Sequence, residues 1–122
     1  MDEEQMVQDV LENIMDHCYT IDELVDRFGK DEDIFMDDVA YQMSCTFLLM
    51  QIGENVKRIE TWLSENSKAI KWKSVCRFRD LIAHNYGKVQ SDMIWNMLDE
   101  DYPVLKSEIT RLLSNIQNDQ SP

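Results

Sequence analysis

A seam of apolar residues at alternating spacings of four and three runs through the first quarter of the chain. Its members are Val7, Leu11, Ile14, Cys18, Ile21, Val25 and Phe28. Because residues at these spacings lie on one face of an α-helix, the seam predicts a single long helix with a buried apolar face. Gly29 follows the seam and is of the residue type that most often ends a helix. Such a seam is typical of a core or a helix–helix contact, and it holds no catalytic residue.

Helical spacing continues beyond this glycine as far as residue 59. Asp31 or Asp33 can cap this second helix. Its apolar residues are Phe35, Val39, Tyr41, Cys45, Leu48, Ile52, Val56 and Ile59. Gly53 lies inside the pattern, where glycine costs about 1 kcal/mol relative to alanine. It is either a tolerated defect or a point where another helix approaches closely.

Residues 64–67 indicate a connection between helices. Ser67 is a candidate cap for a third helix, which we expect from about Lys68 to the mid-80s, ending near Gly87. The second and third helices would then be joined by a short polar link, as is usual between neighbouring helices of a bundle.

Two more helices are expected in the last third of the chain. Ser91 or Asp92 can cap a short one, and Pro103 suits the first turn of the last one. Their apolar residues are Ile94, Trp95, Leu98, Leu105, Ile109, Leu112 or Leu113, and Ile116. The sequence thus predicts an all-α fold, an up-and-down bundle of four to five helices. We expect a single domain over residues 1–117 and a frayed tail at 118–122.

The composition agrees with this fold class. Three glycines and two prolines in 122 residues are too few for a β-sandwich or barrel, and 43% hydrophobic residues argue against disorder. The three cysteines and two histidines lack metal-ligand spacing, so we expect buried thiols, no metal and no cofactor. The acidic start does not fit a signal peptide, and the longest apolar run cannot span a bilayer. We therefore expect a cytoplasmic protein without a membrane partner.

Charge is unevenly distributed along the chain. The net charge is −12, which by itself argues against nucleic-acid binding. Residues 1–40 carry 14 acidic and 2 basic side chains, whereas residues 41–90 carry 4 acidic and 8 basic ones. This asymmetry indicates two surfaces suited to different partners.

The segment Arg79-Asp80-Leu81-Ile82-Ala83-His84-Asn85-Tyr86 departs from the plain helical pattern, because it combines a guanidinium, a carboxylate, an imidazole and a phenol. On a helix, Asp80 and His84 share a face turned away from the core, where the carboxylate can hydrogen-bond and orient the imidazole. Arg79 lies about 140° from His84 on an ideal helix. A compact site then requires either unwinding near His84 or a second copy of the chain, and we favour a symmetric dimer.

Arginine and histidine together suit the cleavage of RNA. The 2′-hydroxyl is an internal nucleophile, so the protein has only to move protons and stabilise charge on the phosphate. Further cations could contact the RNA backbone: Lys57, Arg58, Lys68, Lys71, Lys73, Arg77 and Lys88. A purely structural interpretation stays open, in which His84 interacts with the helix end and Arg79–Asp80 is a surface ion pair.

At these residues the sequence resembles the HEPN superfamily, and more closely its HepT-type toxins. The signature Arg-x4-His-x-Tyr is met by Arg79, His84 and Tyr86, and Asp80 stands at the polar position after the arginine. The segment Gln51-Ile52-Gly53-Glu54 resembles the Ile-Gly-Glu element of the family, which would make Gly53 a close-packing position. The resemblance covers nearly the whole chain. Asn85, Gly53 and Glu54 are expected to support the site.

The resemblance implies a homodimeric helical bundle whose two motifs meet at the interface. It implies a metal-independent endoribonuclease that cleaves tRNA or mRNA, the toxin of a type VII-like toxin–antitoxin pair. Arg79 would bind the scissile phosphate, and His84 would transfer protons. Asp80 would orient the imidazole of His84. A minimal nucleotidyltransferase antitoxin, in a possible larger hetero-oligomer, would transfer AMP to Tyr86, which otherwise positions RNA.

Two other functions compete with this one. The chain could be a non-catalytic helical dimer that docks a nucleotidyltransferase or binds a nucleotide. It could also be a plain interaction bundle in which the motif is accidental, since short motifs often occur by chance.

Overall fold

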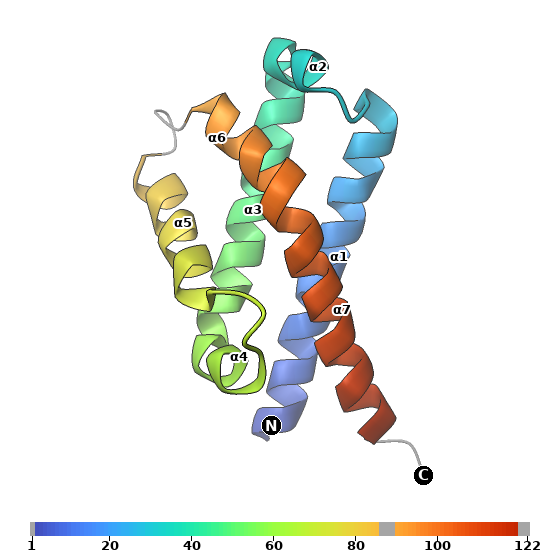
Figure 1. Cartoon of the computed structure of the whole chain (residues 1–122), viewed down its shortest axis with the longest axis vertical. Helices are drawn as coiled ribbons and strands as arrows, with labels where there is room; N and C mark the ends of the chain where they lie inside the picture. The colour runs from blue at the N-terminus through green and yellow to red at the C-terminus, as the bar shows by residue number, and fades with distance from the viewer. Residues whose placement is uncertain (1, 86–89, 120–122) are drawn as a thin grey trace.

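The computed structural model describes residues 2–85 and 90–119, and these form helices and no strand (Figure 1). The α-helices are α1 (Glu3–Phe28), α2 (Glu32–Asp37), α3 (Val39–Arg58), α4 (Glu60–Asn66), α5 (Trp72–His84), α6 (Ser91–Asn96) and α7 (Tyr102–Asp119). A π-helical turn at Met97–Asp101 joins α6 to α7. The predicted all-α fold class is confirmed.

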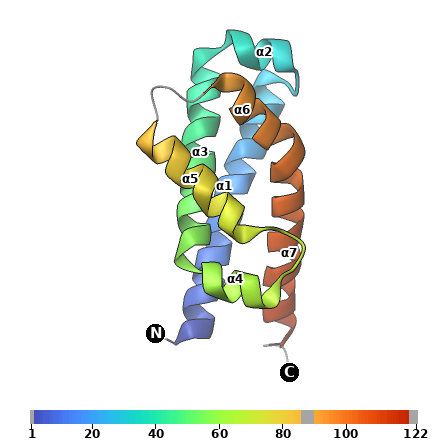
Figure 2. The same ribbon diagram turned by 60° about the vertical axis from the view of Figure 1, so that its left-hand side comes forward.

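The long helices alternate in direction along the bundle. In turn, α1, α3, α5 and the α6–α7 pass run up and down, while α2 and α4 lie at opposite ends (Figures 1 and 2). α3 packs against α1 and against α5, and α7 packs against α1. The motif helix α5 therefore rests on α3, which carries the Ile-Gly-Glu element.

The apolar seam forms the buried face of α1. From Val7 to Ile21 its members are at most 1% exposed, and its last two members are partly buried against the same core. The Asp2 carboxylate accepts a hydrogen bond from the Gln5 amide at 2.7 Å and so caps the first turn. Gly29 ends the helix at φ +106°, a conformation that favours glycine. The prediction for this helix is confirmed.

The expected second helix is in fact divided at Asp38 and again at Ile59. Asp31 caps α2 as expected, but Asp38 has an extended backbone and caps α3 through a 3.0 Å bond from the Tyr41 amide. This break lets α2 turn so that Phe35 is buried, with its ring centroid 5.0 Å from that of Tyr41 in an edge-to-face arrangement. Val39, which the helical spacing placed in the core, is 65% exposed.

The connection before α5 also differs from the prediction. α4 continues to Asn66, so the link is residues 67–71 and α5 begins at Trp72. Ser67 does not cap α5. Its hydroxyl donates to the buried Glu108 carboxylate of α7, and its carbonyl accepts from the Trp72 indole at 3.3 Å. Burial of these groups fixes the link to the core and delays the start of α5.

The two helices expected in the last third of the chain, α6 and α7, are joined by the π turn into one continuous helix. Gln90 stands at the cap position, while the Ser91 hydroxyl donates to the Gln42 side chain at 2.8 Å. Pro103 lies in the first turn of α7, as predicted. Because proline clashes with the carbonyl four residues earlier in an α-helix, the wider π turn before Pro103 accommodates it without ending the helix.

The core face of α7 is the predicted one, with Leu112 buried rather than Leu113. The helix extends through Asp119, beyond the expected start of the frayed tail at residue 118. Within the described ranges, no helix has the length and apolar character needed to cross a membrane.

Candidate active site

α5 is anchored by a buried face and carries the motif on its other faces. Trp72, Val75 and Ile82 are at most 9% exposed. The helix ends at Asn85, whose amide donates to the Leu81 carbonyl at 3.1 Å and whose side chain donates to the same oxygen at 3.2 Å. Asn85 therefore closes the helix after His84. Tyr86, Gly87 and Lys88 lie outside the described residues.

α3 and α5 approach each other closely at Gly53. A Cβ atom at Gly53 would lie 2.5 Å from the Cβ of Arg79 and 3.0 Å from its Cγ. No side chain fits at that separation, so a glycine is required. Of the two interpretations of Gly53, close packing is the correct one.

The side chains around this contact form a cluster of four charges: Glu54, Lys57, Arg79 and Asp80. The Arg79 guanidinium pairs with the Glu54 carboxylate, and its Nη1 donates to Asp80 Oδ1 at 3.1 Å. Lys57 Nζ donates to the same Asp80 oxygen at 3.0 Å. These hydrogen bonds, first from Lys57 and then from Arg79, hold the pKa of the Asp80 carboxyl below its usual range. The charge cluster thus joins two acidic and two basic side chains.

The expected hydrogen bond between Asp80 and His84 is not formed. The Asp80 carboxylate turns to Lys57 and Arg79 instead, and no hydrogen bond joins it to His84 in the described part of the chain. The two cationic side chains already give the carboxylate strong, charge-assisted hydrogen bonds. The prediction considered partners along α5 alone, and Lys57 comes from α3.

Arg79 and His84 face different sides of α5. Arg79 packs against α3 and its side chain is 26% exposed, whereas His84 is exposed at the last position of the helix. α5 stays α-helical through His84, so unwinding before this residue does not bring the two side chains together. Within one chain, the described residues therefore do not bring Arg79 and His84 together.

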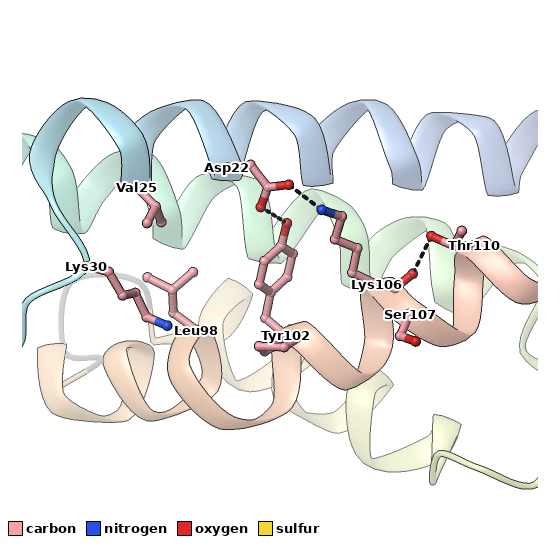
Figure 3. Close-up of a pocket in the computed structure, with 9 residues that line it drawn as sticks. Asp22, Val25, Lys30, Leu98, Tyr102, Lys106, Ser107 and Thr110 are labelled. Carbon is pink, nitrogen blue, oxygen red and sulfur yellow. Dashed lines mark hydrogen bonds and ion pairs between the residues drawn. The ribbon is translucent and has the colours of Figure 1, made fainter.

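A cleft of about 490 Å³ between α1 and α7 was not anticipated from the sequence (Figure 3). Asp22 on α1 accepts a hydrogen bond from the Tyr102 hydroxyl at 2.8 Å and pairs with Lys106. The opposite charges of Asp22 and Lys106 lie at the centre of the cleft and neutralise each other. This ion pair therefore holds α7 against α1. Tyr102 and Lys106 are four residues apart on α7, but nothing in the sequence links them to Asp22.

The cysteines have the properties of apolar core residues. Burial raises the pKa of the Cys18 thiol to about 11 and that of Cys45 to about 12. Cys76 is partly buried, and burial raises its pKa also. At neutral pH all three are thiols, which are poor nucleophiles. Among the described residues, no three histidine, cysteine or acidic side chains are grouped so as to hold a metal ion.

The fold and the packed motif define an all-helical domain of the HEPN type. Residues 9–112 match the family described as "Ribonuclease HepT-like". The chain belongs to this HepT-like ribonuclease family.

Relatives with curated names agree with this assignment. The chain is 31% identical over 108 residues to the "Probable ribonuclease HepT" of Thermococcus cleftensis, covering 86% of this chain and 94% of that one. It is 26% identical over 109 residues to a "Gamma-glutamylcyclotransferase and putative RNase" of Methanocaldococcus jannaschii, covering 88% of this chain. It spans only 49% of that longer relative. No solved structure matches the chain significantly.

Proposed function

We propose that the chain is a cytoplasmic, metal-independent endoribonuclease that cleaves tRNA or mRNA as the toxin of a type VII-like toxin–antitoxin pair. The observation that carries the proposal is the contact of Gly53 with Arg79. It holds the motif arginine against α3 between two carboxylates, on the same helix as an exposed histidine. Membership of a ribonuclease family supports RNA as the substrate.

In the proposed reaction, the 2′-oxygen of RNA attacks the neighbouring phosphorus and the bond to the 5′-oxygen breaks. A cyclic phosphate and a 5′-hydroxyl result. His84 transfers protons, either from the attacking hydroxyl or to the leaving oxygen. Arg79 stabilises the negative charge that develops on the phosphate oxygens, which displace Asp80 from its guanidinium.

Completion of this site requires a homodimer in which Arg79 of one copy meets His84 of the other. An exposed apolar stripe on α3 supports such an interface. Val39, Met43 and Phe47 recur every four residues and are at least half exposed. A stripe of this kind marks a contact surface more often than a free one.

The partner of the pair is a minimal nucleotidyltransferase antitoxin, which silences the toxin by transferring AMP to Tyr86. A phosphate carried by Tyr86 near Arg79 would occupy the position of the RNA phosphate. The acidic residues 1–40 suit a basic surface of this antitoxin, and the two proteins would form a hetero-oligomer.

The test is expression without the antitoxin. Wild type should arrest growth and cleave RNA in the presence of EDTA, while His84→Ala should do neither, with an unchanged circular dichroism spectrum. If wild type and His84→Ala are equally harmless and neither cleaves RNA, the proposed activity is wrong.

A second candidate function is a non-catalytic dimer that docks the nucleotidyltransferase. It is favoured by the state of Arg79, whose guanidinium is partly buried and already bound by Glu54 and Asp80. In that case purified protein should bind the transferase tightly and leave total tRNA intact.

A further inference from the structure

A basic groove of about 390 Å³ lies where the 67–71 link meets α5. Figure 2 shows α5 leaving this link and crossing in front of α3. The groove's cationic side chains are Lys68, Lys71, Lys73 and Arg77. Its lining contains hydroxyl groups but no carboxylate, unlike the cleft of Figure 3, whose lining includes Asp22.

None of these four cations forms an ion pair with any described residue. Lys68 donates to the Ser64 carbonyl at 2.6 Å, and Arg77 donates to the Ser74 hydroxyl at 2.9 Å, which are both neutral partners. By contrast, Lys57, Arg79 and Lys106 each meet a carboxylate. The chain has 24 acidic residues for 12 basic ones, so four clustered cations without a counter-charge are unexpected. An anion bound here would relieve their mutual repulsion.

An exposed face of α5 leads from the groove to His84. Lys73, Arg77 and His84 are four and seven residues apart, which places them on one face of the helix. All three are exposed, while Trp72 and Ile82 are buried. The distance along the helix from Lys73 to His84 is about 16 Å. Asp80 lies beside this face, and its carboxylate is paired with Lys57 of α3 and with Arg79.

We propose that the basic groove binds the phosphate backbone of single-stranded RNA and leads the strand along α5 to His84. The choice of RNA rests on the proposed function. The volume of the groove is typical of clefts that hold ligands of many atoms rather than a lone ion. Unpaired lysines that follow one helix face provide the sequence-independent contacts that a nucleic-acid backbone requires.

The experiment measures binding of a fluorescein-labelled, mixed-sequence single-stranded RNA by anisotropy over a range of salt concentrations. The full-length protein carries His84→Ala so that the RNA stays intact. Lys71→Gln with Lys73→Gln should weaken binding and reduce the slope of log K against log salt by about 1.4, since each phosphate contact on a single strand contributes about 0.7. Both side chains are exposed and form no ion pair, so the thermal midpoint should not change.

Arg27→Gln, compared with Lys73→Gln as a single change, is the matched control, because Arg27 is an exposed cation on α1 that forms no ion pair with a described residue. It should leave affinity and slope unchanged. An equal loss of affinity in this control would overturn the proposal that the groove binds RNA, because it would show that RNA is attracted by the general charge of the protein. The proposal would also be overturned if inorganic phosphate competed with RNA while Lys71→Gln with Lys73→Gln left the slope of log K against log salt unchanged. Preferential binding of polyglutamate over RNA would instead indicate an acidic protein partner and also overturn it.

The groove and the nuclease activity can fail separately. If wild type binds RNA through the groove without cutting it, the groove stands and the nuclease is excluded. If Lys71→Gln with Lys73→Gln binds and cleaves RNA as wild type does, with His84 intact in the cleavage assay, the nuclease stands and the groove is excluded.

Discussion

The contact between Gly53 and Arg79 leaves no space for a side chain at position 53. Gly53→Ala would force α3 and α5 apart, because the atom that the new methyl meets is next to the Arg79 backbone rather than at a flexible end. Overpacking of this kind costs about 1–3 kcal/mol. We expect urea denaturation to show this loss in the free energy of unfolding. Thr61→Ala, at an exposed helical position, should stay within about 0.5 kcal/mol of wild type.

Arg79 holds two carboxylates with a planar group, which lysine cannot reproduce. Arg79→Lys keeps the charge but should lower the rate of RNA cleavage by about 100-fold or more, the effect of removing one donor from a charge-stabilising site. The rate is measured under saturating RNA. Arg77→Lys, two residues earlier on an exposed face, should cleave at nearly the wild-type rate. Equal rates for Arg79→Lys and wild type would exclude Arg79 from the reaction.

At the residue scale, the sequence predicts the close packing at Gly53 but not the partner of Asp80. Gly53 is recognisable because glycine is costly inside a helix, and its contact is found as expected. The partner of Asp80 is not predictable from spacing, since Lys57 lies 23 positions away on another helix. Helical periodicity relates residues within one helix only.

At the scale of elements, the 67–71 link is fixed by a buried carboxylate. Glu108 on α7 accepts from Ser67 and pairs with Arg111 at 2.7–2.8 Å. The Arg111 guanidinium, followed by the Ser67 hydroxyl, holds the pKa of Glu108 below its ordinary 4.5. The folded state therefore favours the carboxylate. Its contribution to stability is complete above pH 4.5 and is lost as the pH falls below that value.

This predicts the response of Glu108→Gln to acid. At pH 7 the variant should melt at a lower temperature than wild type, because the glutamine is uncharged. Between pH 5 and pH 3 the wild-type midpoint should fall further than that of the variant, which cannot titrate at this position. Asp80 titrates in both proteins, so its effect cancels. Parallel decreases in the two midpoints would contradict the assignment.

Helix boundaries are predictable only where the apolar pattern changes at the break. α1 is predicted because a glycine follows the seam. The break at Asp38 is hidden, since apolar residues continue on both sides at compatible spacings and Asp38 is one of several acidic residues nearby. The direction in which α2 turns depends on tertiary packing of Phe35, which one-dimensional spacing does not contain.

At the scale of the whole molecule, the proposed site is divided between two copies. Arg79→Ala and His84→Ala chains should each be inactive alone. After mixing and exchange of subunits, they should recover about a quarter of wild-type activity, because half of the dimers are then mixed and each holds one intact site. The readout is RNA cleavage, with sedimentation velocity to verify dimers. If the mixture stays inactive while mixed dimers form, Arg79 and His84 act within one chain.

The net charge of the whole molecule conceals its basic groove. The four cations of the basic groove follow one another between residues 68 and 77, so the charge distribution along the sequence already indicated a basic region. Whether these cations were neutralised by nearby acidic side chains depended on the fold. In the structure, the carboxylates of the charge cluster pair with Lys57 and Arg79 rather than with these four cations.

The π turn at Met97–Asp101 determines how α7 is rotated about the helix axis relative to α6. It inserts an extra residue into the helical repeat, so that α6 faces α2 and α3 whereas α7 faces α1. One uninterrupted helix thereby covers two different neighbours. Deleting a single residue within the turn would restore a regular repeat and rotate one part against the other by about 100°. Either Ile94 and Trp95, or the buried row that begins at Leu105, would then face solvent.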